Sequence, residues 1–431
     1  MHANRGLIKT KAIMLGLIEK IRRAGVKVYI NSLYPIQKFN EKKIGKKDKI
    51  EVVFFAMNVE MWNYQGVYDL LSKEKRFNCH IVLTGACQYP EEQRKQSLTN
   101  LRNYFRSRNI NYIDFDEEGL GYDVKKLIDP DILFYPQPYG GQYVKRHNFR
   151  TFRYKLICYI PYGVSVLSDY DWVYNTSFHN LAWKLYYPFQ MMRQRAERIQ
   201  TNHARNVLVS GYPNLDYYLS DKSEDVWKIK DRSIKRLIWA PHYTIPSEGN
   251  WITRSNFLWM SNLMLQIAEQ YRDRLQIAFK PHPWLKSRLY EQPEWGVEKT
   301  DIYYDQWSNL SNTFIASGFV DLFKTSDAMI HDSGSFTAEY LFVNKPVAFV
   351  TNDLQGLMEG HSEFGRSALS QHYIVGDEND IRNFIESVVL GENDVMFSQR
   401  NDFFENVLRP NTTGTTSQFI VDDIKKSLGI D

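Results

Sequence analysis

Three short stretches in the second half of the chain combine basic, hydroxyl and small residues in a way that suits a phosphate ligand. Imidazole and ammonium groups make charge-assisted hydrogen bonds to a diphosphate, and positioned donors stabilise a leaving phosphate group. One histidine, His282, lies between two prolines that hold its backbone rigidly. The residue types therefore predict a diphosphate site in which His282 is catalytic. The stretches are Pro241-His242, Lys280-Pro281-His282-Pro283 and His331-Asp332-Ser333-Gly334-Ser335.

The third stretch precedes residues 336–342, whose apolar pattern predicts a short helix. Free backbone N–H groups and the positive dipole end at the start of a helix favour phosphate. The simpler interpretation is that Ser335 only caps this helix. Glu339 lies four residues after Ser335, one too many for a capping box, so it could instead accept a hydrogen bond from a ribose hydroxyl. The predicted donor-binding residues are His242, Lys280, Asp332, Ser333, Gly334, Ser335, Phe336 and Glu339.

Each of the three stretches follows a short apolar segment that is expected to be a buried strand. These segments are residues 237–240, 275–279 and 328–330, and helical patterns lie between them. Alternating strands and helices indicate a parallel sheet, and ligands bind beyond the carboxyl ends of its strands. We therefore expect the three stretches to meet at one edge of a sheet.

The first half of the chain shows the same alternation. The loops that follow its strands, beginning at residues 56, 84, 136 and 161, are expected at a ligand-facing edge. Before them, the pattern predicts a helix over 7–24 that ends at Gly25, a strand over 26–30 and a solvated lysine-rich loop over 38–49. The expected strands are 52–55, 80–83, 110–113, 132–135, 156–160 and 207–209.

Together these patterns predict an α/β protein with two Rossmann-like domains facing a cleft, the GT-B architecture. The first domain is expected over residues 1–220 and the second over 236–431. Residues 221–235 are polar and charged without an apolar period, so they are expected to be the linker.

Composition restricts the class of protein. Of 431 residues, 43% are hydrophobic and 24% charged, as in a globular protein, and the net charge of +4 does not argue for nucleic acid. Three cysteines supply neither a disulfide framework nor metal spacing, and no stretch approaches the roughly 20 apolar residues of a membrane span. Neither G-x-G-x-x-G nor a P-loop is present. We expect a cytoplasmic protein that needs no metal or cofactor and binds no nucleic acid.

Residues 178–205 combine aromatic side chains with lysine and arginine, and Pro188 is expected to kink or split a helix there. Basic residues beside aromatic ones suit contact with anionic lipid headgroups or an anionic polymer. An ordinary pair of amphipathic helices explains the same pattern. Peripheral association with the inner face of a membrane is therefore one of two interpretations.

The second half resembles the CDP-glycerol glycerophosphotransferase family, which includes teichoic-acid primases and polymerases of the bacterial envelope. The resemblance rests on Lys280-Pro281-His282-Pro283 and on residues 326–346, where a strand, a polar turn, a helix and Asn344-Lys345-Pro346 follow in the family's order. Asp332 and Ser335 occupy the outer positions of the family's Asp-Tyr-Ser-Ser turn, with Ser333 and Gly334 between them. The resemblance implies a donor nucleotide in the second domain and an acceptor in the first.

The first domain departs from the family's pattern at Tyr162-Gly163-Val164. The family has a His-Gly-Thr turn here, and its histidine is taken as the base that activates the acceptor. A tyrosine, with a reference pKa near ~10, is a poor base at neutral pH. Tyr162 and Asp169 are the predicted catalytic residues of this domain, with Asp171 and His179 as other candidates for the base.

The predicted function is transfer of glycerophosphate or another polyol phosphate from a CDP-linked donor to an acceptor hydroxyl. CDP-glycerol or CDP-ribitol would be the donor, and a polymer or lipid-linked molecule of the cell envelope or capsule the acceptor. One alternative is a glycosyltransferase that uses a UDP-, CMP- or CDP-linked sugar, with Tyr162 lining the acceptor pocket. Another is a non-catalytic nucleotide-binding partner in polysaccharide assembly.

Overall fold

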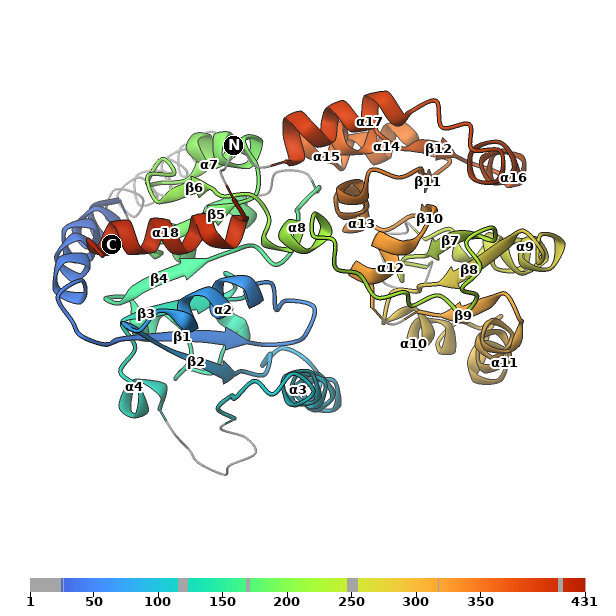
Figure 1. Cartoon of the computed structure of the whole chain (residues 1–431). Helices are drawn as coiled ribbons and strands as arrows, with labels where there is room; N and C mark the ends of the chain where they lie inside the picture. The colour runs from blue at the N-terminus through green and yellow to red at the C-terminus, as the bar shows by residue number, and fades with distance from the viewer. Residues whose placement is uncertain are drawn as a thin grey trace, which may run out of the picture. The chain divides into compact units, whose positions relative to one another are not determined.

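The chain folds into two compact α/β units, each built around a parallel six-stranded sheet (Figure 1). The computed structural model describes residues 25, 27–114, 123–167, 171–245, 255–316, 318–409 and 414–430. The first unit comprises the described residues within Met1–Tyr162, Tyr170–Pro213 and Pro410–Asp431, and the second those within Gly163–Asp169 and Asn214–Arg409. The predicted fold class, two Rossmann-like α/β halves, is confirmed.

The first sheet has the strand order β2-β1-β3-β4-β5-β6, and every neighbouring pair is parallel. All but one of its strands were predicted, because short runs of buried apolar residues mark them. The strands are β1 (Ile50–Ala56), β2 (Phe77–Leu83), β3 (Ile132–Tyr135), β4 (Leu156–Tyr159), β5 (Lys184–Tyr187) and β6 (Val207–Val209).

Helices cover both faces of this sheet. One of them contains residues 27–44, drawn in blue in Figure 1, and the remaining described helices follow the strands in chain order. They are α2 (Gln65–Lys73), α3 (Glu91–Arg106), α4 (Val124–Leu127), α5 (Asp171–Tyr174), α6 (Ser177–Leu181), α7 (Gln190–Ile199) and α18 (Thr416–Leu428).

The second sheet has the order β12-β11-β10-β7-β8-β9, again entirely parallel. Trp239 on β7 stacks on Phe279 of β8, with ring centroids 5.0 Å apart, and both rings belong to the buried core. The strands are β7 (Lys235–Ala240), β8 (Leu275–Phe279), β9 (Thr313–Ile315), β10 (Ala328–His331), β11 (Val347–Val350) and β12 (Tyr373–Val375). The α-helices are α8 (Pro213–Tyr218), α9 (Phe257–Gln270), α10 (Leu285–Tyr290), α11 (Gly296–Asn309), α12 (Val320–Thr325), α13 (Phe336–Glu339), α14 (Leu354–Glu359), α15 (Glu363–Leu369), α16 (Glu378–Asn383) and α17 (Phe397–Phe403).

Several expectations at the start of the chain were wrong. The predicted strand at 26–30 and the first part of the predicted loop at 38–49 lie in or beside the helix that contains residues 27–44. This helix buries Ile30, Leu33 and Ile44, which recur at helical spacing, so the helical period outweighs the short alternation that suggested a strand. The predicted helix at 7–24 lies outside the described residues. The predicted strand at 110–113 is reduced to a single bridge between Val82 and Ile113.

The aromatic and basic stretch at 178–205 is not a kinked helix. It forms α6, the buried strand β5 and α7, and Pro188 lies between the strand and α7. Tyr186 and Tyr187 on β5 are buried in the first unit and do not face solvent. The aromatic residues of this stretch therefore serve the core.

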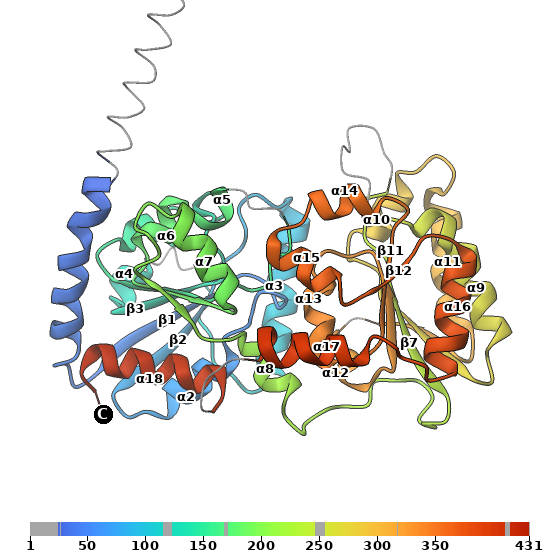
Figure 2. The same ribbon diagram turned by 90° about the horizontal axis from the view of Figure 1, so that it is seen from above.

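The last helix of the chain packs in the first unit, although the sequence suggested a second domain that continued to residue 431. Helix α18 lies beside α2 in both views (Figure 1, Figure 2). Asp423 of α18 pairs with Lys184 and accepts a 2.8 Å hydrogen bond from the Tyr186 hydroxyl. A Cβ atom at Gly45 would lie 1.9 Å from the Leu428 carbonyl oxygen, so this close approach requires glycine.

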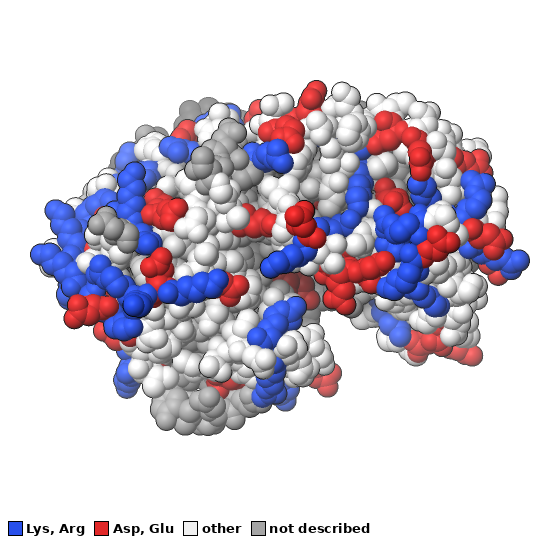
Figure 3. Space-filling model, in the orientation of Figure 1, with Lys and Arg blue, Asp and Glu red and all other residues white. Residues whose placement is uncertain are grey.

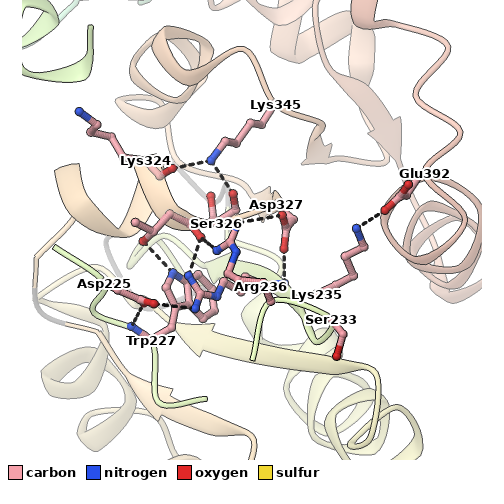
Figure 4. Close-up of polar contacts among 12 residues, drawn as sticks. Asp225, Trp227, Ser233, Lys235, Arg236, Lys324, Ser326, Asp327, Lys345 and Glu392 are labelled. Atoms are coloured by element: carbon pink, nitrogen blue, oxygen red, sulfur yellow. Dashed lines mark hydrogen bonds and ion pairs between the residues drawn. The ribbon is translucent and has the colours of Figure 1, made fainter. Parts of the chain in front are cut away.

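The predicted linker is held against the second unit at the amino-terminal edge of its sheet (Figure 4). The Arg236 guanidinium is 1% exposed, donates a 2.8 Å hydrogen bond to Asp225 and lies over the Trp227 ring. Trp227 is itself buried and donates to the Thr325 hydroxyl at 3.0 Å. The polar composition of this segment predicted a linker, but its charged residues bind the sheet edge.

The turn after the 3₁₀ helix η3 (Tyr340–Val343) also lies at the amino-terminal edge of the second sheet. Asn344 ends η3 with a left-handed backbone, at φ 50°. The Lys345 ammonium then donates to the carbonyl oxygens of Phe323, Lys324 and Ser326 at 3.2, 2.7 and 2.5 Å. Burial lowers the pKa of Lys345 to about 8. The Asn-Lys-Pro turn therefore terminates one element and caps the carbonyl end of α12.

We predict that Arg236→Ala lowers the free energy of unfolding by about 3 kcal/mol, because it removes a buried, hydrogen-bonded guanidinium from its ion pair. Urea unfolding followed by circular dichroism measures the change. Arg232→Ala is the matched control, since the Arg232 side chain is 58% exposed and, like Arg236, donates to the Thr325 carbonyl. It should cost less than about 1 kcal/mol. Equal losses in the two variants would contradict a structural role for the buried network.

Candidate functional site

The three predicted phosphate-binding stretches follow three adjacent strands of the second sheet, in the order β10, β7 and β8. His331 pairs with Ala240, and Trp239 pairs with Phe279, so the loops leave the sheet at nearly the same level. The rings of His242 and His282 have centroids 5.1 Å apart. The expectation that these stretches converge on one edge is thus met within the second unit.

Asp332 ties these loops together. Its carboxylate accepts hydrogen bonds from the backbone N–H groups of His242 and Asn256, both at 2.6 Å. The side chain is 3% exposed, and burial raises its pKa to about 6, although the amide hydrogen bonds oppose this shift. Asp332 was predicted to contact the donor, but both of its oxygens are occupied by protein amides. Its geometry is that of a positioning residue.

His282 presents one ring nitrogen for chemistry. Its Nδ1 accepts a 3.1 Å hydrogen bond from the Trp284 backbone N–H, so in the neutral ring Nε2 carries the proton. Burial, together with His242 and Lys280, lowers the pKa of His282 to about 3. His282 is therefore neutral at physiological pH, and its Nε2–H is a hydrogen-bond donor suited to a phosphate oxygen.

Two aromatic residues that the sequence did not single out surround His282. The ring centroids of Tyr243 and Trp284 lie 4.4 and 5.9 Å from that of His282. Each follows a histidine motif directly in the chain, so this adjacency could have predicted that both lie near His282. Asn256, at the start of α9, was also missed because nothing in its local sequence connects it with Asp332.

The helix after the third loop is shorter than expected. Helix α13 covers only Phe336–Glu339, and Ser335 already has a helical backbone and makes no side-chain capping bond. Ser335 is exposed, Gly334 half-buried and Ser333 buried. The capping interpretation of Ser335 therefore loses its support, while contact of Ser333, Gly334 and Ser335 with phosphate stays a prediction.

Phe336 and Glu339 face the protein interior. The Phe336 ring meets Phe323 at 5.1 Å between centroids, which anchors α13 on α12. Glu339 is 6% exposed, and its charge contributes to the raised pKa of the buried Tyr218 phenol. Assignment of Glu339 to a ribose hydroxyl stays a prediction, as does assignment of Lys280 to phosphate. The Lys280 backbone N–H donates to Trp239 at 2.8 Å, which fixes the start of its loop.

In the first unit, Tyr162 follows β4 and is 36% exposed. Its carbonyl accepts a 2.9 Å hydrogen bond from the Tyr212 hydroxyl, and burial raises the pKa of its phenol above the ordinary value near 10. Tyr162 is therefore neutral at physiological pH, which agrees with its expected weakness as a base.

Of the alternative bases, the side chain of His179 is described by the structure and those of Asp169 and Asp171 are not. His179 is buried, and its Nδ1 accepts from the Thr176 backbone N–H at 3.3 Å, so its one lone pair is used inside the protein. Burial lowers its pKa to about 3. Asp169 lies outside the described residues, and so does the side chain of Asp171. Among described residues, no three His, Cys, Asp or Glu side chains form a group that could hold a metal ion.

Comparison with known proteins identifies a family. Residues 175–359 match the family model described as CDP-Glycerol:Poly(glycerophosphate) glycerophosphotransferase. This range contains all three loops of the second unit, whereas Tyr162 precedes it. No curated protein matches the chain.

Solved structures with the same fold come from two groups. The wall teichoic acid polymerase TagF, in a crystal soaked with CDPG, is 13% identical, with 96% of this chain and 98% of that chain covered and a TM-score of 0.57. A putative UDP-N-acetylglucosamine 2-epimerase from Listeria monocytogenes is 13% identical, with 88% and 96% covered and a TM-score of 0.55. The UDP-GlcNAc 2-epimerase from Neisseria meningitidis, bound to UDP-GlcNAc, is 15% identical, with 88% and 100% covered and a TM-score of 0.53.

At identities of 13–15%, the solved structures establish only the two-sheet architecture. The likeness to a family therefore rests on the family model. The motifs that suggested the family, from Lys280 to Pro346, all lie inside the matched range. Over residues 175–359, this chain matches the model of the CDP-glycerol glycerophosphotransferase family.

Proposed function

We propose that this protein transfers glycerophosphate, or a related polyol phosphate, from a CDP-linked donor to an acceptor hydroxyl in the synthesis of a bacterial cell-envelope polymer. One observation carries the proposal: the neutral His282 Nε2–H stands at the meeting point of three loops inside the range that matches the family. A preorganised donor of this kind stabilises charge that develops on a phosphate during transfer.

In the proposed reaction, the acceptor oxygen forms a bond to the distal phosphorus of the donor. The bond between that phosphorus and the oxygen of CMP breaks, and CMP leaves with the bonding electron pair. His282 and Lys280 hold the diphosphate, and the proton of the acceptor hydroxyl passes to a base. Asp169 and Asp171 are the remaining candidates for this base, because Tyr162 and His179 are unsuited to it.

A glycosyltransferase remains the second candidate, because Tyr162 stands where the family has its histidine. Incubation of the whole chain with CDP-glycerol, CDP-ribitol or UDP-sugars, followed by ³¹P NMR of the product, separates the two. A phosphodiester signal together with CMP release supports phosphate transfer. A product without phosphorus, formed from a nucleotide sugar, would replace the proposal by glycosyl transfer.

We also propose that the protein associates peripherally with an anionic membrane surface through the helix that contains residues 27–44. No described helix is long and apolar enough to cross a bilayer. Val28 and Phe39 are 69% and 66% exposed on this helix, and Lys38, Lys42 and Lys43 are exposed near them. Basic side chains gather over this part of the first unit in Figure 3. Exposed apolar residues flanked by lysines suit an anionic lipid interface.

His282→Ala should lower the rate of CMP release at saturating donor by roughly 10²–10³-fold, because it removes the donor to the phosphate. His282→Gln restores a side-chain N–H and should recover part of the lost rate. Thermal unfolding of both variants verifies that the fold is intact. Near-normal turnover in His282→Ala would remove this residue from the mechanism, and a Gln variant as slow as Ala would argue against a role as donor.

Donor binding should weaken as the pH falls through about 6, the raised pKa of Asp332. Above this pH the carboxylate is charged and accepts from both backbone amides. Because burial raises the pKa, protonation below it does not destabilise the fold, but it removes one acceptor and so releases one of the two amides. We expect the KM for CDP-glycerol to rise about tenfold between pH 7 and pH 5. Asp332→Asn should show a raised KM without this pH dependence. The same dependence in Asp332→Asn would assign it to another group.

The double variant Val28→Ser/Phe39→Ser should reduce co-sedimentation with phosphatidylglycerol vesicles by roughly tenfold, because it removes two exposed apolar side chains from the helix. Val395→Ser/Phe397→Ser is the matched control, since these residues are 74% and 53% exposed in the second unit. Equal binding by the two double variants would contradict a membrane role for the helix.

A further inference from the structure

Tyrosines end three adjacent strands of the first sheet. Tyr135, Tyr159 and Tyr187 are the last residues of β3, β4 and β5. Tyr135 pairs with Tyr159, and Tyr159 pairs with Leu185, two residues before Tyr187, so the three side chains point to the same face of the sheet. The edge at which they gather is the one that binds ligands in parallel sheets.

Further tyrosines join them from the loops at this edge. Those at positions 64, 139 and 162, together with Tyr187 of β5, lie close enough to Tyr159 to contribute to its raised pKa. Besides burial, tyrosines likewise raise the pKa of Tyr162 and Tyr187: Tyr89 acts on the first, and Tyr174 and Tyr139 act on the second. Tyr159, Tyr162 and Tyr187 are therefore surrounded by phenols, which are neutral at physiological pH.

Some polar atoms of this cluster have no partner within the described part of the chain. The Tyr187 hydroxyl is buried and unbonded, in a side chain that is 1% exposed, and the Tyr64 hydroxyl is also unbonded. The Asn63 amide nitrogen donates to the Pro161 carbonyl at 2.6 Å, which orients the amide and leaves its buried Oδ1 without a donor. Buried polar groups are normally hydrogen-bonded, so unbonded ones at a ligand-binding edge indicate a ligand that completes them.

The chemistry of these atoms restricts the ligand. Asn63 Oδ1 can only accept a hydrogen bond, so the ligand must bring a donor, whereas phenol hydroxyls both donate and accept. An ionised phosphate only accepts, and it would leave Oδ1 facing an anion. A sugar or polyol hydroxyl satisfies both kinds of group, and the 36% exposed ring of Tyr162 offers a face for the ring of a sugar.

We propose that the tyrosine cluster at the carboxyl edge of the first sheet is an acceptor subsite that binds an uncharged glycosyl unit through its hydroxyls. The proposal rests on the transferase function proposed above, because it names the class of its acceptor. Tyr187 and Asn63 are specificity-determining residues in this proposal. They select a hydroxylated ring over an anionic polyol phosphate.

The test measures binding of two probes, methyl β-D-glucopyranoside and glycerol 3-phosphate, to the whole chain by saturation-transfer NMR. We expect the wild type to bind the glucoside and to discriminate against glycerol 3-phosphate. Tyr187→Phe should weaken glucoside binding by roughly five- to tenfold, the effect of one hydrogen bond. It should leave the unfolding midpoint unchanged, because the hydroxyl has no partner in the protein.

Tyr186→Phe is the matched control on the neighbouring position of β5. It removes the 2.8 Å hydrogen bond to Asp423, so it should lower the unfolding midpoint and leave glucoside binding intact. Absence of glucoside binding, a preference for glycerol 3-phosphate, or undiminished binding by Tyr187→Phe would each overturn the proposal. CDP-glycerol binding is measured in parallel to separate the acceptor subsite from the proposed donor. If glucoside binds and CDP-glycerol does not, only the assignment of the donor is refuted.

Discussion

The buried carboxylate of Asp332 is the interaction on which the site of the second unit depends. Parallel strands bring three loops to one edge, but strand pairing alone does not fix their conformations. Asp332 does so by accepting hydrogen bonds from the backbones of His242 and Asn256, which lie in different segments. A charged group with 3% exposure is costly unless hydrogen bonds compensate for its lost hydration. Because these hydrogen bonds form only when the loops hold this arrangement, they also make the arrangement specific.

The two units carry different chemistry, each at the carboxyl edge of its own sheet. The second offers His282 as a neutral hydrogen-bond donor beside the cationic side chain of Lys280, which suits an anionic leaving group. The first presents phenols whose pKa values are raised by burial and by one another. Tyr162 in place of a histidine fits this second environment, because a hydroxyl recognises neutral polar ligands and does not take up a proton near pH 7. In the proposed reaction, acceptor recognition and proton removal thus fall to different residues.

The sequence predicted most strands of both sheets, because short apolar runs bounded by turn residues mark buried parallel strands, but it missed β5, β9 and β12. It also located the convergent loops, since motifs after adjacent strands meet at one edge. It failed where tertiary contacts outweigh local pattern: residues 27–30 alternate like a strand but belong to a helix, and β5 is rich in tyrosine and lysine. The role of Asp332 could not be read from residue type, because its amide partners come from other segments.

Helix α18 has a consequence for how the protein is made. Its residues Ile420, Val421, Ile424 and Leu428 complete the core of the first unit, although they follow the whole second unit in the chain. The second unit has its whole sheet within residues 214–409, and these residues leave the ribosome before α18 does. Domains fold as units when their residues are available. During translation, the second unit can therefore reach its native state first, while the unit that begins the chain waits for its final helix.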